Sequence, residues 1–120
     1  MKPILAFDTS AAHCAAALLW DDRCTLRTDP MPTGQAEHLI PMLEEMLGAA
    51  GLTWRDLSAI GVGTGPGNFT GVRIAVAAAR GLALALGIPA IGVSVLEALA
   101  LGQSGIVVTD ARRGMAYLQP

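Results

Sequence analysis

Charged and aromatic side chains are scarce in this chain of 120 residues. Charged residues make up 15% of it and aromatic residues 4%, whereas a typical soluble domain is about 25% charged. Apolar residues reach 52% before the 14 glycines are added. A domain of this size has too little interior to bury so much apolar surface, so we expect part of that surface to bind a partner. That partner is another chain, a second copy, or a missing part of the same polypeptide.

Signals of membrane, secreted and nucleic-acid-binding proteins are missing as well. Arg80 interrupts the longest apolar run before it reaches the roughly 18–20 residues that span a bilayer. No signal peptide precedes Asp8, so the default expectation is a cytoplasmic protein. Cys14 and Cys24 are too few for a disulfide framework and lack zinc-like spacing, which predicts two reduced thiols. A net charge of −2 without a basic block makes the chain a poor candidate for binding a nucleic-acid backbone.

The sequence also lacks a catalytic or metal-binding constellation. No serine stands in a GxSxG motif, and neither cysteine has a plausible base near it in sequence. His13 and His38 lie far apart, with no further His or Cys at ligand spacing, as is typical of structural or surface histidines. We therefore predict no catalytic residue, no metal and no cofactor.

The pattern of apolar and turn residues predicts an α/β fold. Three short strands joined by turns should form an antiparallel meander, and helices then alternate with strands, which favours a mixed sheet flanked by helices. The predicted strands cover residues 3–7, 14–20, 24–28, 59–64, 89–93 and 105–109. The predicted helices cover residues 36–50, 70–86 and 94–101.

The second long helix is unusually apolar. Between residues 72 and 86 the only charged residues are Arg73 and Arg80, seven positions apart on one stripe. A helix that is apolar nearly all round has to be covered on most sides. One side should rest on the sheet, and the other carries small residues that would let a second helix approach closely: Gly71, Ala75, Ala78 and Ala85. A plain alanine-rich core helix, or one covered by a missing half of the chain, is the alternative that the sequence leaves open.

Two loops have the form of phosphate-binding sites. Residues 65–71 are a glycine-rich turn between a strand and a helix, a geometry that offers free N–H groups to an anion, although the Walker Gly-Lys-Ser/Thr ending is absent. An Asp-Thr-Ser turn ends the first strand. The candidate phosphate-binding residues are Asp8, Thr9, Ser10, Gly65 and Gly67. For the glycines the alternative is a tight turn that needs positive φ, and for the aspartate and serine it is simple turn capping.

Together these segments resemble the TsaB family. The matching stretches are ILAFDTSAAHCAAALL, AEHLIPMLEEML, VVTDARRGMAY and the most specific one, AIGVGTGPGNFTGVRIAVAAARGLALALGIPAIGVSVLEALA. The resemblance implies an actin-like, ribonuclease-H-like fold of two similar lobes. Residues 1–104 would be the N-terminal lobe, and residues 105–120 would begin a second lobe that is otherwise missing.

The resemblance also implies a function in tRNA modification without catalysis. TsaB-like proteins are scaffold subunits that pair with the catalytic TsaD subunit and with TsaE, an ATPase, to make N6-threonylcarbamoyladenosine in tRNA. They form homodimers when isolated, and they meet tRNA only through the complex, away from any membrane. Gln35 stands where the family often has a histidine, and the HxxxH metal motif of TsaD-like relatives is absent.

The first lobe's two long helices would make the contact with TsaD. The implied interface residues are His38, Met42, Glu45, Met46, Gly71, Ala75, Ala78 and Leu82. Two rival functions remain open. One is a nucleotide- or phosphate-binding enzyme fragment of the actin-like superfamily, such as an ATPase or sugar kinase. The other is a glycoprotease-like peptidase, for which the chain offers no nucleophile–base pair.

Overall fold

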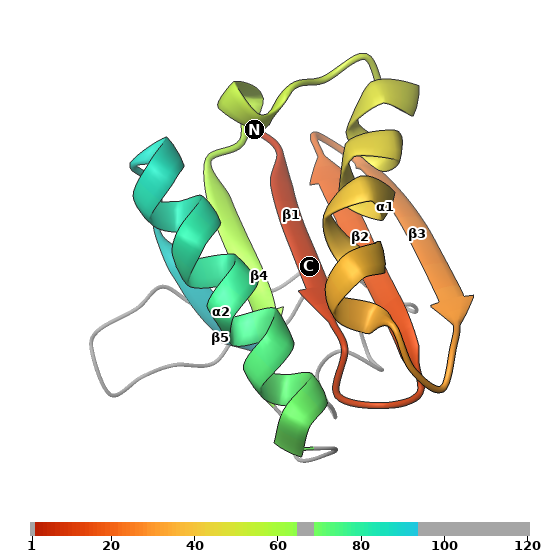
Figure 1. Cartoon of the computed structure of the whole chain (residues 1–120). Helices are drawn as coiled ribbons and strands as arrows, with labels where there is room; N and C mark the ends of the chain where they lie inside the picture. The colour runs from red at the N-terminus through yellow and green to blue at the C-terminus, as the bar shows by residue number, and fades with distance from the viewer. Residues whose placement is uncertain (1, 65–68, 94–120) are drawn as a thin grey trace.

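A computed structural model describes residues 2–64 and 69–93 of the chain. Within them the elements follow in the order β1 (Ile4–Asp8), β2 (His13–Trp20), β3 (Arg23–Pro30), α1 (Gln35–Ala49), η1 (Trp54–Asp56), β4 (Ala59–Gly63), α2 (Phe69–Leu86) and β5 (Ala90–Val93). The strands form one sheet in the order β3-β2-β1-β4-β5 (Figure 1). The predicted fold class, a mixed sheet that starts with a three-stranded meander, is confirmed.

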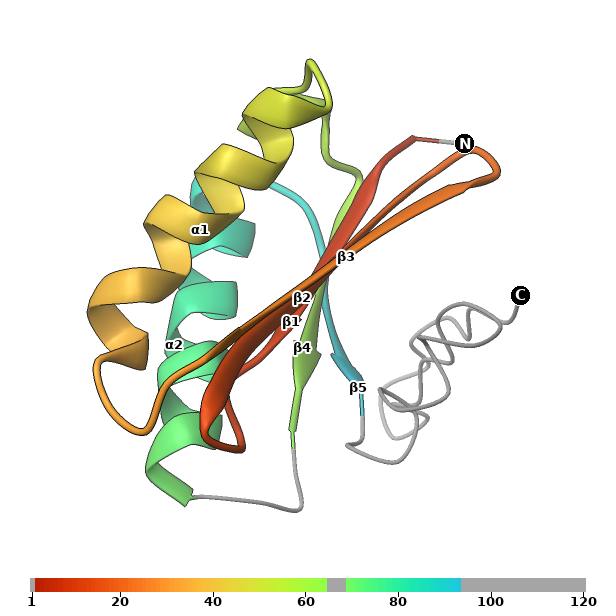
Figure 2. The same cartoon turned by 90° about the vertical axis from the view of Figure 1, so that its right-hand side faces the viewer.

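The sheet combines two kinds of strand pairing. β2 pairs antiparallel with β1 and β3, so the first three strands are joined by short turns. β4 pairs parallel with β1 and β5. Parallel neighbours need a crossover, and α1 and α2 supply the two crossovers. Both helices lie on the same face of the sheet (Figure 2).

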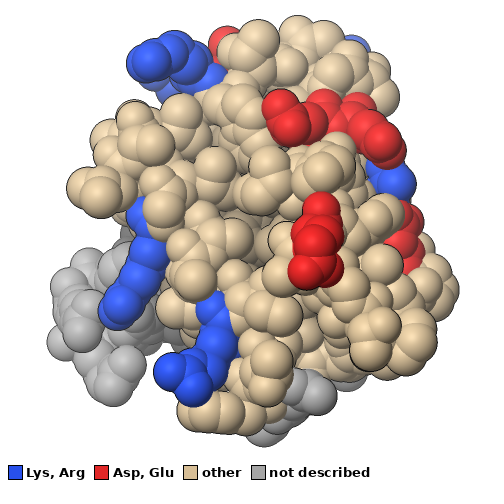
Figure 3. Space-filling model, viewed as in Figure 1, with Lys and Arg blue, Asp and Glu red and all other residues tan. Residues whose placement is uncertain are grey.

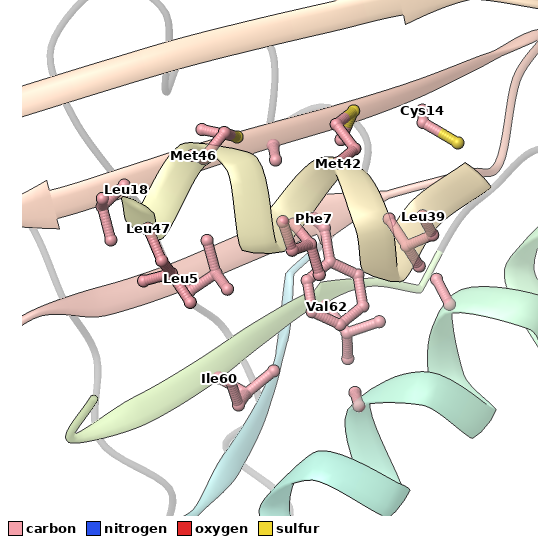
Figure 4. Close-up of a cluster of buried hydrophobic side chains, with 14 of the residues drawn as sticks. Leu5, Phe7, Cys14, Leu18, Leu39, Met42, Met46, Leu47, Ile60 and Val62 are labelled. Atoms are coloured by element: carbon pink, nitrogen blue, oxygen red, sulfur yellow. The ribbon is translucent and has the colours of Figure 1, made fainter. Parts of the chain in front are cut away.

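The hydrophobic core lies between that face and the two helices. Successive strand residues point to opposite faces, so Leu5 and Phe7 of β1 reach the same core as Ile60 and Val62 of β4 (Figure 4). The apolar stripe of α1 fills the space above them, with its buried residues Leu39, Met42, Leu43, Met46 and Leu47. Each such side chain contributes roughly 1.5–3 kcal/mol when it is fully buried. The apolar stripe of α1 is therefore covered by the sheet of the same chain.

The boundaries of α1 follow from its flanking glycines. Gly34 and Gly51 both have positive φ, at 89° and 72°, a conformation that glycine adopts without strain. Gly51 follows the C-cap Ala50 and stops the helix, as its sequence position predicts. Pro41 lies inside the helix and not in its first turn, because the helix begins at Gln35.

Some predicted features fall outside the described residues. They are the helix at residues 94–101, the strand at residues 105–109, the start of a second lobe at residues 105–120, and the loop glycines Gly65 and Gly67.

Candidate partner-binding face

The end of β1 is a buried polar turn. Asp8, Thr9 and Ser10 are all buried, and the most exposed of them, Asp8, exposes 8% of its surface. Asp8 Oδ1 accepts hydrogen bonds from the backbone N–H and from the hydroxyl of Ser10, each at 2.6 Å. The Thr9 hydroxyl donates to the carbonyl of Gly71 at the start of α2. One oxygen of Asp8 and the hydroxyls of Thr9 and Ser10 are therefore engaged within the chain itself.

Two glycines let neighbouring elements approach that turn. A Cβ on Gly63 would lie 2.0 Å from Asp8 Oδ2, and a Cβ on Gly71 would lie 1.9 Å from the Thr9 carbonyl oxygen. No side chain larger than hydrogen fits at either position. Gly71 was predicted to make room for a partner helix. The structure corrects this, because the residue that approaches Gly71 is Thr9 of the same chain.

These contacts bear on the predicted phosphate site. For Asp8 and Ser10 the structure shows the turn-capping alternative, with the carboxylate already bonded inside its own turn. His13 Nε2 lies 4.0 Å from Asp8 Oδ1. Residues 2–64 and 69–93 contain no group of three His, Cys, Asp or Glu side chains placed to hold a metal ion.

The outward face of α2 is largely uncovered. Gly71, Ala75 and Ala79 are its buried residues, and their spacing of four places them on one stripe, which packs mainly on β4. On the opposite side Leu84 is 87% exposed, and Phe69 at the helix start is 72% exposed. The other exposed residues of α2 are Thr70, Arg73, Ala77, Arg80, Gly81 and Ala85.

The composition of α2 also meets a membrane criterion. By length and hydropathy alone Phe69–Leu86 is a candidate span, so Arg80 does not exclude one, contrary to the sequence prediction. The helix nevertheless lies along the sheet (Figure 1). It packs on the sheet through its buried small residues. A helix placed on a sheet in this way is an element of a folded lobe.

The structure divides the predicted interface residues into two groups. Met42, Met46, Gly71 and Ala75 are buried inside the lobe, so their assignment to an exposed interface is wrong. The reason is the same on both helices: their regular apolar or small-residue stripe is the side that meets the sheet. Of the other four, Glu45 is exposed, and His38, Ala78 and Leu82 are half-buried.

His38 and Glu45 belong to a polar network that the sequence did not reveal. Arg27 of β3 donates two hydrogen bonds to Asp29, at 3.0 and 2.8 Å, and a third to Glu45 of α1 at 2.8 Å. His38 Nε2 lies 2.6 Å from Asp29 Oδ2. The hydrogen bonds from Arg27 and then from His38 lower the pKa of Asp29 to about 2. This network ties the edge strand β3 to α1.

The signal for that network was present but weak. Arg27 and Asp29 alternate along one face of a strand, and His38 and Glu45 stand seven residues apart on one side of a helix. Nothing in the local sequence says that this strand and this helix are neighbours. The engagement of His38 and Glu45 with β3 also leaves them less free to bind a partner.

Charges are segregated on the helical side of the molecule. Figure 3 shows acidic side chains over α1 and basic side chains over α2. Glu37, Glu44 and Glu45 are exposed on α1, and Arg73 and Arg80 are exposed on α2. Between the helix N-termini lies a groove of about 310 Å³, lined by Thr33, Ala36, Glu37, Thr70 and Ile74 among others. We call the exposed surface of α1 and α2 the helical face.

Comparisons with known proteins agree with this architecture. A family model described as TsaD, tRNA N6-adenosine threonylcarbamoyltransferase, matches residues 34–119. The TsaB protein of Escherichia coli, described as a tRNA threonylcarbamoyladenosine biosynthesis protein, is 37% identical over 95% of this chain and 52% of its own length. The Bacillus subtilis TsaB protein is 38% identical over the same shares. The chain spans about half the length of these relatives.

Solved structures show the same fold. YeaZ from Pseudomonas aeruginosa matches 86% of this chain and 50% of its own, with a TM-score of 0.80 and 40% identity. RuvC of Thermus thermophilus, in complex with a Holliday junction substrate, matches 81% of this chain with a TM-score of 0.50 and 11% identity. The second likeness concerns the fold alone and agrees with the predicted ribonuclease-H-like class.

Proposed function

Since the chain belongs to the family of TsaD and TsaB proteins of tRNA threonylcarbamoyladenosine biosynthesis, we propose that it is a non-catalytic scaffold subunit of that bacterial system. Its helical face binds a TsaD-like catalytic subunit, and a TsaE-like ATPase joins the assembly. Residues 1–104 form the N-terminal lobe, and residues 105–120 begin a second one. The isolated protein forms a homodimer through the same face, and the assembly works in the cytoplasm.

The observation that carries this proposal is the uncovered face of α2. Leu84 exposes 87% of its surface to solvent, and complete burial of a leucine contributes roughly 1.5–3 kcal/mol. Gly81 and Ala77 are exposed about one and two turns before it. Their small side chains would let a partner helix approach the backbone closely. An apolar, shallow helical surface of this kind is suited to another helix.

The charges on the helical face give such a contact an orientation. Arg73 and Arg80 on α2 would attract acidic groups of the partner, and Glu37 and Glu44 on α1 would attract basic ones. A second copy related by a two-fold axis presents both, since its α1 can lie near the first copy's α2. The same arrangement accommodates a homodimer or a related subunit with a similar lobe.

A scaffold role is supported by the way Asp8 is used. Its carboxylate accepts two hydrogen bonds from Ser10, so it acts as the cap of its own turn. In the proposed assembly the transfer chemistry belongs to the TsaD-like subunit. Calorimetry with magnesium and ATP should detect no binding to this chain, and saturable binding in the micromolar range would favour the rival enzyme function.

The direct test compares two exposed leucines. Leu84→Glu places a carboxylate on the helical face, and Leu26→Glu places one on β3, where Leu26 is 50% exposed. Burying an unpaired carboxylate at an interface costs several kcal/mol. Leu84→Glu should weaken binding to a TsaD-like subunit at least tenfold in surface plasmon resonance, whereas Leu26→Glu should change it less than threefold. Circular dichroism checks that both variants fold.

Two results would contradict the proposal. One is a wild-type chain that binds no TsaD-like subunit and sediments as a monomer at every concentration up to about 100 μM. That concentration is comparable to the Kd of a weak transient complex. The other is equal loss of binding in both leucine variants, which would place the interface elsewhere.

A further inference from the structure

The strand β3 has one open side. Among the described residues it pairs only with β2, and it stands at one edge of the sheet (Figure 1). Six of its eight residues are exposed, and the other two, Arg27 and Asp29, are half-buried. An edge strand presents a row of unpaired backbone groups, which can pair with a strand of another chain.

The hydrogen bonds to β2 show which backbone groups of β3 point outward. The N–H of Met31 donates to the carbonyl of Ala12 at 3.0 Å, in register with the paired strands. Hydrogen-bonded pairs alternate along antiparallel strands, so the odd-numbered residues of β3 are bonded to β2. The even-numbered residues direct their N–H and carbonyl groups away from the sheet. These outward-pointing residues are Cys24, Leu26 and Thr28.

The charges of β3 do not protect its open edge. Natural edge strands commonly carry free charges that discourage pairing with another chain. Arg27 instead donates hydrogen bonds to Asp29 and to Glu45 of α1, so both charged side chains of β3 are held on the helical side of the sheet. Pro30, which has no N–H to offer a partner, stands only at the end of the strand. Residues 24–28 are therefore open to a second strand.

The sequence of β3 is complementary to itself in the antiparallel direction. Arg23 and Asp29 stand three residues before and three residues after Leu26. When two copies pair about a two-fold axis at Leu26, Arg23 of each copy lies opposite Asp29 of the other, and the two leucines face each other. Opposite charges in cross-strand pairs stabilise a sheet, whereas like charges destabilise it. Registers centred on Thr25 or Arg27 would place arginines opposite each other, so the charges favour the register at Leu26.

Leu26 and Asp29 each have capacity for such a contact. The side of β3 that carries Leu26 faces away from the helices, and Leu26 is 50% exposed, so a second leucine would cover it. The carboxylate of Asp29 takes part in three hydrogen bonds, with Arg27 and His38, of about four that a carboxylate can accept. Its side chain is 25% exposed. Arg23 of a second copy would therefore find an acceptor there.

The helices leave room for this pairing. A two-fold axis perpendicular to the sheet places the helices of both copies on the same side of the joined sheet. α1 packs on β2, one strand inside the edge. In the joined sheet β2 and its copy are three strand spacings apart, about 14 Å, whereas packed helices need only about 8–10 Å between their axes. The two α1 helices would therefore not collide.

We propose that a second copy of this chain binds along β3, so that two five-stranded sheets join into one continuous sheet. The occupant is a second copy because β3 is matched in charge to itself. This interface lies at the edge of the sheet, and it does not depend on the proposed function of the helical face. The helical face of each copy remains open to its own partner.

A disulfide cross-link tests the register directly. In Thr28→Cys the new thiol lies opposite Cys24 of the second copy, and the roughly 5.5 Å between paired Cα atoms suits a disulfide. Within one chain residues 24 and 28 are about 13 Å apart along the strand, too far to be bridged. Mild oxidation should therefore convert Thr28→Cys into a covalent dimer on a non-reducing gel, and mass spectrometry should identify the linked peptides.

The cross-linking is done with Leu84→Glu present in every chain, so that association through the helical face does not contribute. Two controls carry the same background. One has Cys24 as its only exposed thiol, and the other adds Thr70→Cys, the same replacement at an exposed position of α2. Both should form at least tenfold less covalent dimer than Thr28→Cys.

Sedimentation velocity measures the same contact without a cross-link. The Leu84→Glu chain should still form a reversible dimer. Adding Leu26→Glu, which places two carboxylates opposite each other at the two-fold axis, should weaken this dimer at least tenfold. Arg23→Glu, which faces Asp29 of the other copy, should also weaken it, whereas Arg23→Lys should change it less than threefold. Circular dichroism checks that each variant folds.

Three results would overturn the inference. They are a Leu84→Glu chain that stays monomeric up to about 1 mM, equal cross-linking in Thr28→Cys and Thr70→Cys, and an unchanged dimer in Leu26→Glu. Binding of Leu26→Glu to a TsaD-like subunit provides a separate readout. It should stay within threefold of the wild type, so failure of the β3 interface and failure of the helical face are distinguishable.

Discussion

Replacing Gly71 by alanine would place a methyl group at the point where α2 meets the end of β1. The added Cβ would lie 1.9 Å from the Thr9 carbonyl oxygen, and an ordinary contact needs at least 3.4 Å. The obstructing atom belongs to the backbone, so helix and turn must separate. Overpacking of this kind typically costs about 1–3 kcal/mol. Loss of the hydrogen bond from Thr9 to Gly71 adds about 0.5–1.5 kcal/mol.

Gly81→Ala is the matched control on the same helix. A Cβ at Gly81 would meet nothing within 4 Å, and alanine is favoured over glycine inside a helix by roughly 0.5–1 kcal/mol. The two identical substitutions should therefore have opposite signs. We expect a stability loss of roughly 2–4 kcal/mol for Gly71→Ala and a gain for Gly81→Ala.

Urea denaturation followed by tryptophan fluorescence measures both free energies of unfolding, at one low protein concentration that limits self-association. A Gly71→Ala variant as stable as the wild type would refute the close approach of α2 to the β1 turn. Gly71 would then return to the set of residues that could face a partner.

Three further predictions follow from burial and charge. Ala75→Glu should unfold the lobe, because Ala75 is 0% exposed and an unpaired buried carboxylate costs several kcal/mol. Ala77→Glu, at an exposed position, should leave the circular dichroism spectrum unchanged but weaken association. The reverse pattern would mean that the buried and exposed faces of α2 are misassigned. The pKa of Asp29 is lowered to about 2 from its ordinary value of 3.8. Its network therefore stabilises the fold above about pH 4 and loses this effect as the pH falls toward 2. Asp29→Asn should therefore be less stable than the wild type at pH 6 in urea denaturation, with the difference shrinking toward pH 2, and a constant difference would contradict the pKa. Exposed Cys24 should react with a thiol reagent in the native protein. Cys14 is buried, and its pKa is raised by burial and by Asp29, so it should react only on unfolding. Equal reaction rates of the two thiols, measured by mass spectrometry, would refute this difference.

Much of the fold could be predicted from the sequence because its signals are local. The apolar stripe of residues 36–50, the glycines that end each long helix and the short turns of the meander each specify an element within a few residues. Gly51 and Gly87 both have the positive φ that stops a helix. The mixed sheet followed from the switch between turns and helical crossovers, whereas the order of its strands came only with the structure.

The partner-facing residues could be predicted only in part, because a periodic pattern does not say which stripe meets the sheet. Both sides of α2 are built of small apolar residues. The pattern placed Gly71 and Ala75 on the side that faces a partner, but the structure buries both. The decisive contact is between Gly71 and Thr9, 62 residues apart in the chain. The network of Arg27 with Glu45 was missed for the same reason, since it joins elements that only the folded lobe brings together.

The central claim is that the exposed side of α2 becomes covered when the protein assembles. Hydroxyl-radical footprinting with and without a TsaD-like subunit measures the solvent accessibility of Leu84 and Leu26 in one experiment. We predict strong protection of Leu84 and unchanged labelling of Leu26. A stable complex in which Leu84 is labelled as heavily as in the free chain would contradict the claim.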